Sequence, residues 1–99
     1  MAANPLYVLQ LFVADDAPNS VQARGNLRAF CLSHLRECHR IEVIDVFADP
    51  ARALNEGIFM TPTLIKRLPL PVRRIVGTLS DLEALREALG IEVDGHAVD

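Results

Sequence analysis

The chain alternates between short apolar runs and longer segments in which apolar residues recur every three or four positions. Residues 6–14 form an apolar run that only Gln10 interrupts, which predicts a central strand buried on both faces. Further strands are expected at three places downstream: 41–46, 63–68 and 72–76. The last two are joined by the turn Pro69-Leu70-Pro71, and strands joined by so short a turn should pair antiparallel.

Two helical segments are expected between these strands. The first follows the turn at residues 15–18, with Asn19 as its N-cap and Gln22 completing a capping box. Its apolar face is predicted at Val21, Leu27, Phe30, His34 or Leu35, and Cys38. The second is short, begins at Asp49-Pro50 and ends near Gly57.

A third helix follows the last strand, and its two ends have clear signals. Ser80 is the predicted N-cap, and Glu83 completes a capping box with it. Gly90 is typical of a helix stop. The apolar stripe is predicted at Leu82, Leu85 and Leu89. The polar tail, residues 94–99, is expected to be frayed.

The predicted order is strand, helix, strand, short helix, two strands and a helix. A strand–helix–strand unit of this length implies a right-handed crossover and a parallel pair. This is the α/β order of a thioredoxin-like β-α-β-α-β-β-α fold, in one domain over residues 1–99. The triplet Thr61-Pro62-Thr63 supports it, because thioredoxin-like folds usually carry a cis proline at the start of that strand. We therefore predict a cis bond before Pro62.

Composition and charge narrow the function classes. The chain has 99 residues, of which 51% are hydrophobic and 23% charged, which suits a single packed domain. The net charge of −3 gives no general attraction to nucleic acid or anionic lipid. No apolar stretch is long enough to cross a bilayer, and the first residues are too polar for a signal peptide. With only two cysteines, we expect a protein of the reducing cytoplasm.

A thioredoxin-like order raises the question of thiol redox chemistry, which needs a cysteine of low pKa where the first helix begins. Residues 15–20 contain no cysteine there. Asp15 and Asp16 would raise the pKa of a nearby thiol, and no histidine or serine is placed beside them for acid–base catalysis. The sequence therefore predicts no enzyme activity and no cofactor.

Cys31, His34, Cys38 and His39 are the candidate metal ligands, because zinc binds both residue types and the first three would share a helical face. Seven residues of helix span about 10 Å, which is too far for one ion to join both cysteines. Cys31 is interpreted instead as a small core residue and His34 as a residue of the surface or boundary. We expect no metal.

Four basic residues cluster on the predicted hairpin: Lys66, Arg67, Arg73 and Arg74. Alternate residues of a strand face opposite sides, so at most half of them share one face with a partner. The five aromatic residues of the chain give no stacking platform for single-stranded nucleic acid. The cluster is either a protein-binding surface or a solvated face. Together with Tyr7, these four are our predicted partner-binding residues.

Several segments, taken in register, carry a likeness to a known family. They are Leu11-Phe12-Val13-Ala14, Ala17-Pro18-Asn19-Ser20-Val21, Val43-Ile44-Asp45-Val46 followed by Asp49-Pro50, and Thr61-Pro62-Thr63-Leu64. The most specific segment is residues 68–77, followed by Leu79-Ser80. From about Leu6 to Leu89 the chain resembles the KaiB family of the bacterial circadian clock.

The resemblance implies a binding protein rather than an enzyme. KaiB proteins adopt a tetrameric state with a rearranged C-terminal half, and a monomeric thioredoxin-like state that binds the hexameric ATPase KaiC. We therefore expect a KaiC-like partner whose phosphorylation or output is modulated. A KaiA-like protein or a sensor kinase is a further expected partner, a homo-oligomer (dimer or tetramer) is expected, and nucleic acid and membrane are not. The residues expected to matter for the fold change are Pro62, Pro69, Pro71, Gly77, Ser80 and Ala88.

The chain also departs from the family pattern. Gly77-Thr78-Leu79-Ser80 replaces the family's Gly-Asp-Leu-Ser, and Ala88 replaces a glycine. Gln10, Gln22 and Glu42 stand at family positions that are basic and contribute to partner surfaces. These departures favour a member from outside the cyanobacterial clock, in which the KaiC-like partner is retained more securely than the KaiA-like one. Two alternatives remain: a thioredoxin-like adaptor or stress-response module without clock partners, and a KaiB-like sensory domain of a kinase.

Overall fold

Seven elements form the fold in the predicted order. The computed structural model describes residues 5–91, so the predicted frayed tail at 94–99 lies outside the described residues. The elements are β1 (Tyr7–Val13), α1 (Pro18–His34), β2 (His39–Asp45), α2 (Pro50–Asn55), β3 (Thr63–Leu68), β4 (Arg73–Val76) and α3 (Leu82–Leu89). Each predicted strand and helix is present, with bounds that differ by a few residues.

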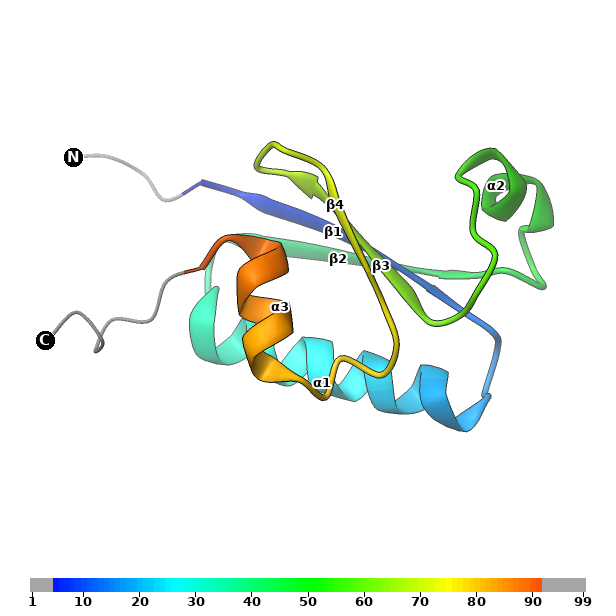
Figure 1. The fold of residues 1–99 in the computed structure, drawn as a ribbon, viewed down its shortest axis with the longest axis horizontal. Helices are drawn as coiled ribbons and strands as arrows, with labels where there is room; N and C mark the ends of the chain where they lie inside the picture. Colours follow the sequence, from blue (N-terminus) through cyan, green and yellow to red (C-terminus); the bar gives the residue numbers. More distant parts are fainter. Residues whose placement is uncertain (1–4, 92–99) are drawn as a thin grey trace, which may run out of the picture.

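The strands form one mixed sheet in the order β2-β1-β3-β4. The β1–β2 pair is parallel and the β3–β4 pair is antiparallel, as the connection lengths predict. Strand β3 is also antiparallel to β1. Helices α1 and α3 lie on the same side of this sheet, whereas α2 stands at one end of it (Figure 1). The α/β thioredoxin-like arrangement is therefore confirmed.

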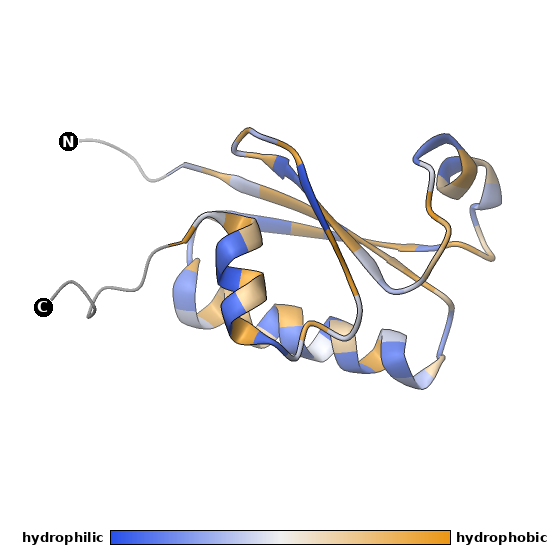
Figure 2. Cartoon of the chain, viewed as in Figure 1, coloured by the Kyte–Doolittle hydropathy of each residue, from blue (hydrophilic) through white to orange (hydrophobic). Residues whose placement is uncertain are grey.

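The main core lies between the sheet and the pair α1 and α3. Residues of β1 alternate between the two faces, and Leu9, Leu11 and Val13 join this core from the helix-covered side. They pack with buried residues of the helices, among them Leu27 and Leu85. Figure 2 shows the apolar residues concentrated along the strands, while α1 and α3 alternate between apolar and hydrophilic residues. Each helix packs its apolar flank on the sheet, so that the apolar faces of both layers are removed from water.

Helix α1 begins earlier than predicted, and the capping box at Asn19 and Gln22 is wrong. Its N-cap is Ala17, which makes no side-chain cap hydrogen bond. Pro18 occupies the first turn, where its missing N–H is not needed and its fixed φ suits a helix, so Asn19 falls inside the helix. The hydroxyl of Ser20 is buried and accepts a hydrogen bond from the Ala14 N–H at 3.0 Å, which ties the helix start to the end of β1.

The apolar face predicted for α1 is correct at Leu27, Phe30 and Leu35, all of them buried, and wrong at Val21 and Cys38. Val21 is 51% exposed, because it lies on the flank of the helix that faces away from the sheet. The helix ends at His34, where the Leu35 N–H closes the last turn onto the Cys31 carbonyl at 2.7 Å. Cys38 therefore lies beyond the helix, in the turn that leads into β2.

Helix α3 is capped by Asp81 and not by Ser80 as predicted. One carboxylate oxygen of Asp81 accepts hydrogen bonds from the Glu83 and Ala84 N–H groups, both at 3.1 Å. Ser80 instead pairs its hydroxyl with that of Thr78 at 2.7 Å. Gly90 ends the helix with a φ of 71°, as predicted, in the left-handed region that a glycine adopts without strain.

The stripe predicted for α3 is only partly buried. Leu85 and Leu89 are in the core, whereas Leu82 is 55% exposed and belongs to the first turn. In α2, the predicted start is confirmed, since the Asp49 side chain accepts a hydrogen bond from the Arg52 N–H at 3.2 Å. The peptide bond before Pro62 is cis, as predicted, and the bonds before Pro69 and Pro71 are cis as well.

Candidate protein-binding surface

The face of the sheet opposite α1 and α3 carries a row of polar side chains. The register places Gln10 of β1 beside Glu42 of β2, and alternation puts Arg67 of β3 on the same face. We call the residues Gln10, Glu42, Arg52, Glu56 and Arg67 the polar row. Beneath it, a small second core of Phe12, Ile44 and Ile65 is buried against Val46 and Ile58.

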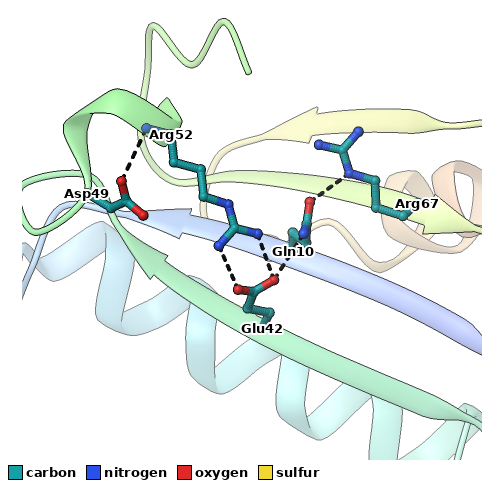
Figure 3. Close-up of polar contacts among 5 residues, drawn as sticks. All are labelled: Gln10, Glu42, Asp49, Arg52 and Arg67. Atoms are coloured by element: carbon teal, nitrogen blue, oxygen red, sulfur yellow. Dashed lines mark hydrogen bonds and ion pairs between the residues drawn. The ribbon is translucent and has the colours of Figure 1, made fainter. Parts of the chain in front are cut away.

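The polar row is joined by hydrogen bonds across three strands and α2 (Figure 3). The carboxylate of Glu42 accepts two bonds from the Arg52 guanidinium, at 2.7 and 2.8 Å, and one from the Gln10 amide at 3.0 Å. The amide oxygen of Gln10 in turn accepts a bond from Arg67 Nε at 2.7 Å. A single chain of contacts therefore runs from α2 through β2 and β1 to β3.

Both partners of the Glu42–Arg52 pair are held in their charged forms. Hydrogen bonds from Arg52, and then from Gln10, lower the pKa of the Glu42 carboxyl. The hydrogen bond to Glu42 raises the pKa of the Arg52 guanidinium. The Glu42 side chain is about half exposed, so solvent screening leaves the pair a small role in stability. Its main effect is to cancel the charges that this part of the face presents to a partner.

The far end of α2 is bound to the same face by two arginines of the hairpin. Arg67 makes an ion pair with Glu56, the residue that caps the C-terminus of α2. Arg74 of β4 donates to the main-chain carbonyls of Glu56 and Gly57, the latter at 3.4 Å. Both arginines therefore orient α2 relative to the sheet.

The predicted basic cluster divides between the two faces. Lys66 lies opposite Arg73 in the β3–β4 register, on the side that α1 and α3 cover, while Arg67 and Arg74 lie on the open face. Lys66 is only 4% exposed, and its burial, then the charge of Arg73, lowers its pKa. Arg73 is exposed. The four residues do not form one continuous surface, which agrees with the expectation that at most half share a face.

Tyr7 belongs to the main core. Its side chain is buried, and its N–H donates to the Cys38 carbonyl at 2.8 Å where β1 starts beside β2. Burial, then the neighbouring Cys38, raises the pKa of the phenol. Tyr7 and Lys66 therefore offer little surface to a partner in this fold, and their role in binding stays a prediction.

The residues expected to matter for a fold change lie mostly in the connections of the C-terminal half. Pro62 is buried at the entry to β3, and its carbonyl accepts a hydrogen bond from the Gly77 N–H at 2.9 Å. Pro69 and Pro71 flank the β3–β4 turn, Ser80 lies between β4 and α3, and Ala88 is inside α3. Their role in a fold change stays a prediction.

One contact between the halves of the chain has no sequence signal. The Asn26 side chain of α1 donates to the Thr78 carbonyl at 2.9 Å and approaches the Ser80 hydroxyl at 3.4 Å. Gln22, one turn earlier, reaches the same hydroxyl at 3.5 Å. The connection between β4 and α3 is therefore fastened to α1 by polar contacts.

Neither cysteine stands where α1 begins, since Cys31 lies in the second half of the helix and Cys38 follows it. Cys31 is buried in the main core, as interpreted from the sequence, and burial, then Cys38, raises the pKa of its thiol to about 11. The single helical face predicted for Cys31, His34 and Cys38 is wrong, since Cys38 lies outside α1. Within residues 5–91, no group of three His, Cys, Asp or Glu residues could hold a metal ion. In the same part of the chain, no helix is long and apolar enough to cross a membrane.

Large apolar side chains are exposed around α2. They are Phe47 at 72%, Leu54 at 73%, Phe59 at 93% and Met60 at 63%. We call these four the α2 apolar group. They lie in α2 and in the two connections that flank it, at the end of the sheet where α2 stands (Figure 1). All four fall in one short segment, residues 47–60. Exposed apolar residues that form a contiguous patch are typical of protein-binding sites, whereas single ones are common on any surface.

Comparisons with known proteins agree with the family resemblance and with the fold. Residues 10–91 match the family model described as the KaiB domain. The chain is 43% identical over 94 residues to the circadian clock oscillator protein KaiB of Prochlorococcus marinus strain MIT 9312, covering 95% of this chain and 90% of that protein.

Two solved structures share the fold at low sequence identity. The N-terminal domain of Synechococcus elongatus SasA aligns with a TM-score of 0.72 at 24% identity, covering 91% of this chain and 89% of that domain. Mitochondrial thioredoxin 3 of Saccharomyces cerevisiae aligns with a TM-score of 0.70 at 16% identity, covering 88% and 79%. Each likeness shows the fold alone.

Proposed function

The chain belongs to the KaiB family of circadian clock proteins, and from this premise we propose that it is a non-enzymatic regulator that binds a KaiC-like hexameric ATPase and modulates its phosphorylation or output. A KaiA-like protein or a sensor kinase is a further candidate partner, and self-association into a dimer or tetramer is part of the proposal.

The α2 apolar group is the observation that carries the proposal. In a chain of 99 residues, four large side chains are left in water around one short helix, Phe59 almost completely. Removing such side chains from water is the main favourable term in protein association, and aromatic residues are frequent among those that dominate binding. A regulator without catalytic groups needs a surface of this kind, because it acts only through the partner that it contacts.

The polar row supplies a polar rim beside the α2 apolar group. Interfaces commonly surround an apolar centre with polar residues that keep contact with solvent. Arg52 and Glu56 belong to α2 and its cap. Leu54 is two residues from each of them, and residues two apart on a helix do not face each other, so Leu54 lies on the side of α2 away from the polar row. A partner therefore contacts both surfaces only if it reaches across α2.

Glu42 is the observation that favours the alternative, a thioredoxin-like adaptor or stress-response module without clock partners. An acidic residue stands at this exposed position of β2 and is neutralised within the chain by Arg52. A partner that selects a basic residue at this position loses its contact.

Size-exclusion chromatography of the full chain, with and without a KaiC-like hexamer and ATP, tests the proposal. We expect co-elution, and a changed phosphorylation level of the hexamer. The variants Phe59→Ser and Leu54→Ser should weaken binding by about tenfold or more, since each removes a large apolar contact. Leu32→Ser is the matched control, because Leu32 is 57% exposed on α1, away from α2.

Two outcomes contradict the proposal. The absence of co-elution in ATP would favour the adaptor. Equal binding of Phe59→Ser, Leu54→Ser and the parent chain would exclude the α2 apolar group as the contact surface. Elution of the free chain reports in the same experiment whether it is a monomer, a dimer or a tetramer.

A further inference from the structure

Helix α1 carries a hollow on the flank that faces away from α3. Gly25 lies in it, and Val21, Arg24, Arg28 and Asp16 form its walls; we call these five the Gly25 hollow. Its volume is about 210 Å³. This is below the range of about 300–1,000 Å³ that is usual for small-molecule pockets, so the hollow suits one or two side chains of a partner.

The glycine is not required by the packing of the protein itself. A Cβ at Gly25 would meet nothing within 4 Å, so alanine would fit without a clash. Gly25 lies in the middle of a 17-residue helix, where glycine is less favourable than every residue except proline. The missing side chain therefore opens a space on the surface without relieving any contact inside the fold.

The walls of the hollow are basic, and one of their donors is unpaired. Arg24 and Arg28 are four residues apart and so lie on the same flank of α1. Arg24 Nε is buried and makes no hydrogen bond to any residue in the part of the chain that the structure describes, so no ion pair inside the fold engages this nitrogen. The hollow therefore has two guanidinium groups and one carboxylate around it, which favours an anionic group over Gly25.

The other two lining residues, Val21 and Asp16, favour an acidic protein segment over other anions. Val21 is 51% exposed and offers an apolar contact beside the arginines, which a free phosphate would not use. Asp16 closes the other end and disfavours a ligand that is negative along its whole length, such as a nucleic acid backbone. No aromatic residue is present in the lining for a base to stack on.

We propose that the Gly25 hollow is a second docking site, in which an acidic side chain of a protein partner binds Arg24 and Arg28 over Gly25 while a neighbouring apolar residue packs on Val21. The site lies on the helix-covered side of the sheet, whereas the polar row lies on the other side. It is also separate from the flank of α1 that Asn26 and Gln22 fasten to the β4–α3 connection. A partner at the hollow therefore leaves the surface of the proposed function free.

The test uses the full chain, labelled with ¹⁵N, and a blocked peptide in which glutamates are flanked by leucines. We expect amide shift changes at Val21, Arg24, Gly25 and Arg28, and none with the same peptide carrying glutamine in place of glutamate. Arg24→Gln and Arg28→Gln should each weaken binding by about tenfold, since each removes a charge-assisted hydrogen bond. Arg36→Gln, which removes the same charge beyond the end of α1, is the matched control.

A second pair of variants tests the shape of the hollow without changing charge. Gly25→Leu fills it and should abolish the peptide shifts, whereas Ala51→Leu adds a leucine at an exposed position of α2, away from α1, and should leave them unchanged. Peptide shifts that persist in Gly25→Leu, or that appear equally with the glutamine peptide, overturn the proposal. So does a stronger response of the same amides to inorganic phosphate or a short oligonucleotide than to the acidic peptide. Because this experiment contains no ATPase, its outcome is independent of the proposed function.

Discussion

The guanidinium of Arg52 donates two hydrogen bonds to the carboxylate of Glu42, at 2.7 and 2.8 Å, and so joins the short helix α2 to the edge strand β2. Because of this pair, the acidic residue at position 42 has a binding partner within the chain. Arg52 neutralises the exposed charge of Glu42, and the same contact links α2 to the sheet. Position 42 is therefore both a surface residue and a structural one.

The Glu42 carboxyl is expected to titrate at a lower pH than an ordinary glutamate, because its pKa is lowered first by the Arg52 hydrogen bonds and then by Gln10. Arg52→Gln should move the midpoint back toward the ordinary value near 4.3. A group with a lowered folded-state pKa stabilises the fold above its unfolded pKa, and this contribution is lost as the pH falls through the folded pKa. Carbon-detected NMR titration measures both midpoints. An unchanged Glu42 midpoint in Arg52→Gln would show that the pair does not form in solution.

Asp81 is expected to be the residue that stabilises the start of α3. Asp81→Ala removes the acceptor for two N–H groups and should lower the free energy of unfolding by about 1 kcal/mol, the usual effect of losing an N-cap. Ser80→Ala is the matched control, since the Ser80 hydroxyl accepts from neither group, and its effect should be smaller. Urea denaturation monitored by circular dichroism compares the two variants. A larger loss in Ser80→Ala would contradict the assignment of the cap.

Ala88→Gly is expected to shift the balance away from the thioredoxin-like fold. Ala88 lies inside α3, and glycine at an interior helix position is less favourable than alanine by about 1 kcal/mol, or about fivefold in population. NMR of parent and variant at equal concentration measures the thioredoxin-like fraction. Ala29→Gly is the control, because it weakens α1 and leaves α3 intact. The same or a larger thioredoxin-like fraction in Ala88→Gly would refute the helix argument.

Lys66→Met is expected to make the stability of the protein less dependent on pH in the alkaline range. The lowered pKa of Lys66 means that the folded chain releases this proton at a lower pH than the unfolded chain does. Between that pKa and the unfolded value of about 10.4, the unfolded state binds more protons, so the free energy of unfolding of the parent rises with pH. The variant should therefore be the more stable protein at pH 7, and its advantage should shrink as the pH rises. If the free energies of unfolding of Lys66→Met and the parent change in parallel with pH, the pKa of Lys66 is not lowered in the folded protein.

Cys31 is expected to be unreactive in the native protein. Its pKa of about 11 leaves about a hundredfold less thiolate at neutral pH than an ordinary cysteine has, and the side chain is buried. In a Cys38→Ser background, iodoacetamide should label Cys31 rapidly in urea and very slowly without it. The parent chain should show no turnover in an insulin-reduction assay. Turnover that disappears in Cys31→Ala would sink the argument.

The order of elements along the chain and the directions of the β1–β2 and β3–β4 pairs could be predicted because they depend on local patterns. The apolar run of β1, the short Pro69–Pro71 turn and the stop at Gly90 each constrain the chain within a few residues. The N-cap residues of the helices were harder to predict, since several residues capable of capping are adjacent in the sequence. Ser80 and Asp81 are equally suitable by type, and the Thr78 hydroxyl decides between them by engaging Ser80.

Most of the candidate site could not be predicted, because its contacts join residues that are distant in the chain. Alternation along β3 predicts that Lys66 and Arg67 face opposite sides, but not which side the helices cover. The bond from Arg67 to Gln10 spans 57 positions and depends on the register of β1 with β3. Val21 and Leu82 are apolar in sequence and exposed in the fold, because each lies on a helix flank that no other element covers.

The attachment of α2 to the sheet has a thermodynamic consequence. Two ion pairs fix this helix, Glu42 with Arg52 and Glu56 with Arg67, and Leu54 is presented from the same helix. We therefore expect a ligand that competes for either carboxylate to change the orientation of α2, and with it the affinity of the proposed binding surface at Leu54 for its partner. By thermodynamic reciprocity, a partner that binds Leu54 would change the affinity of the competing ligand by the same factor. Binding at the two proposed surfaces is therefore expected to be coupled through α2.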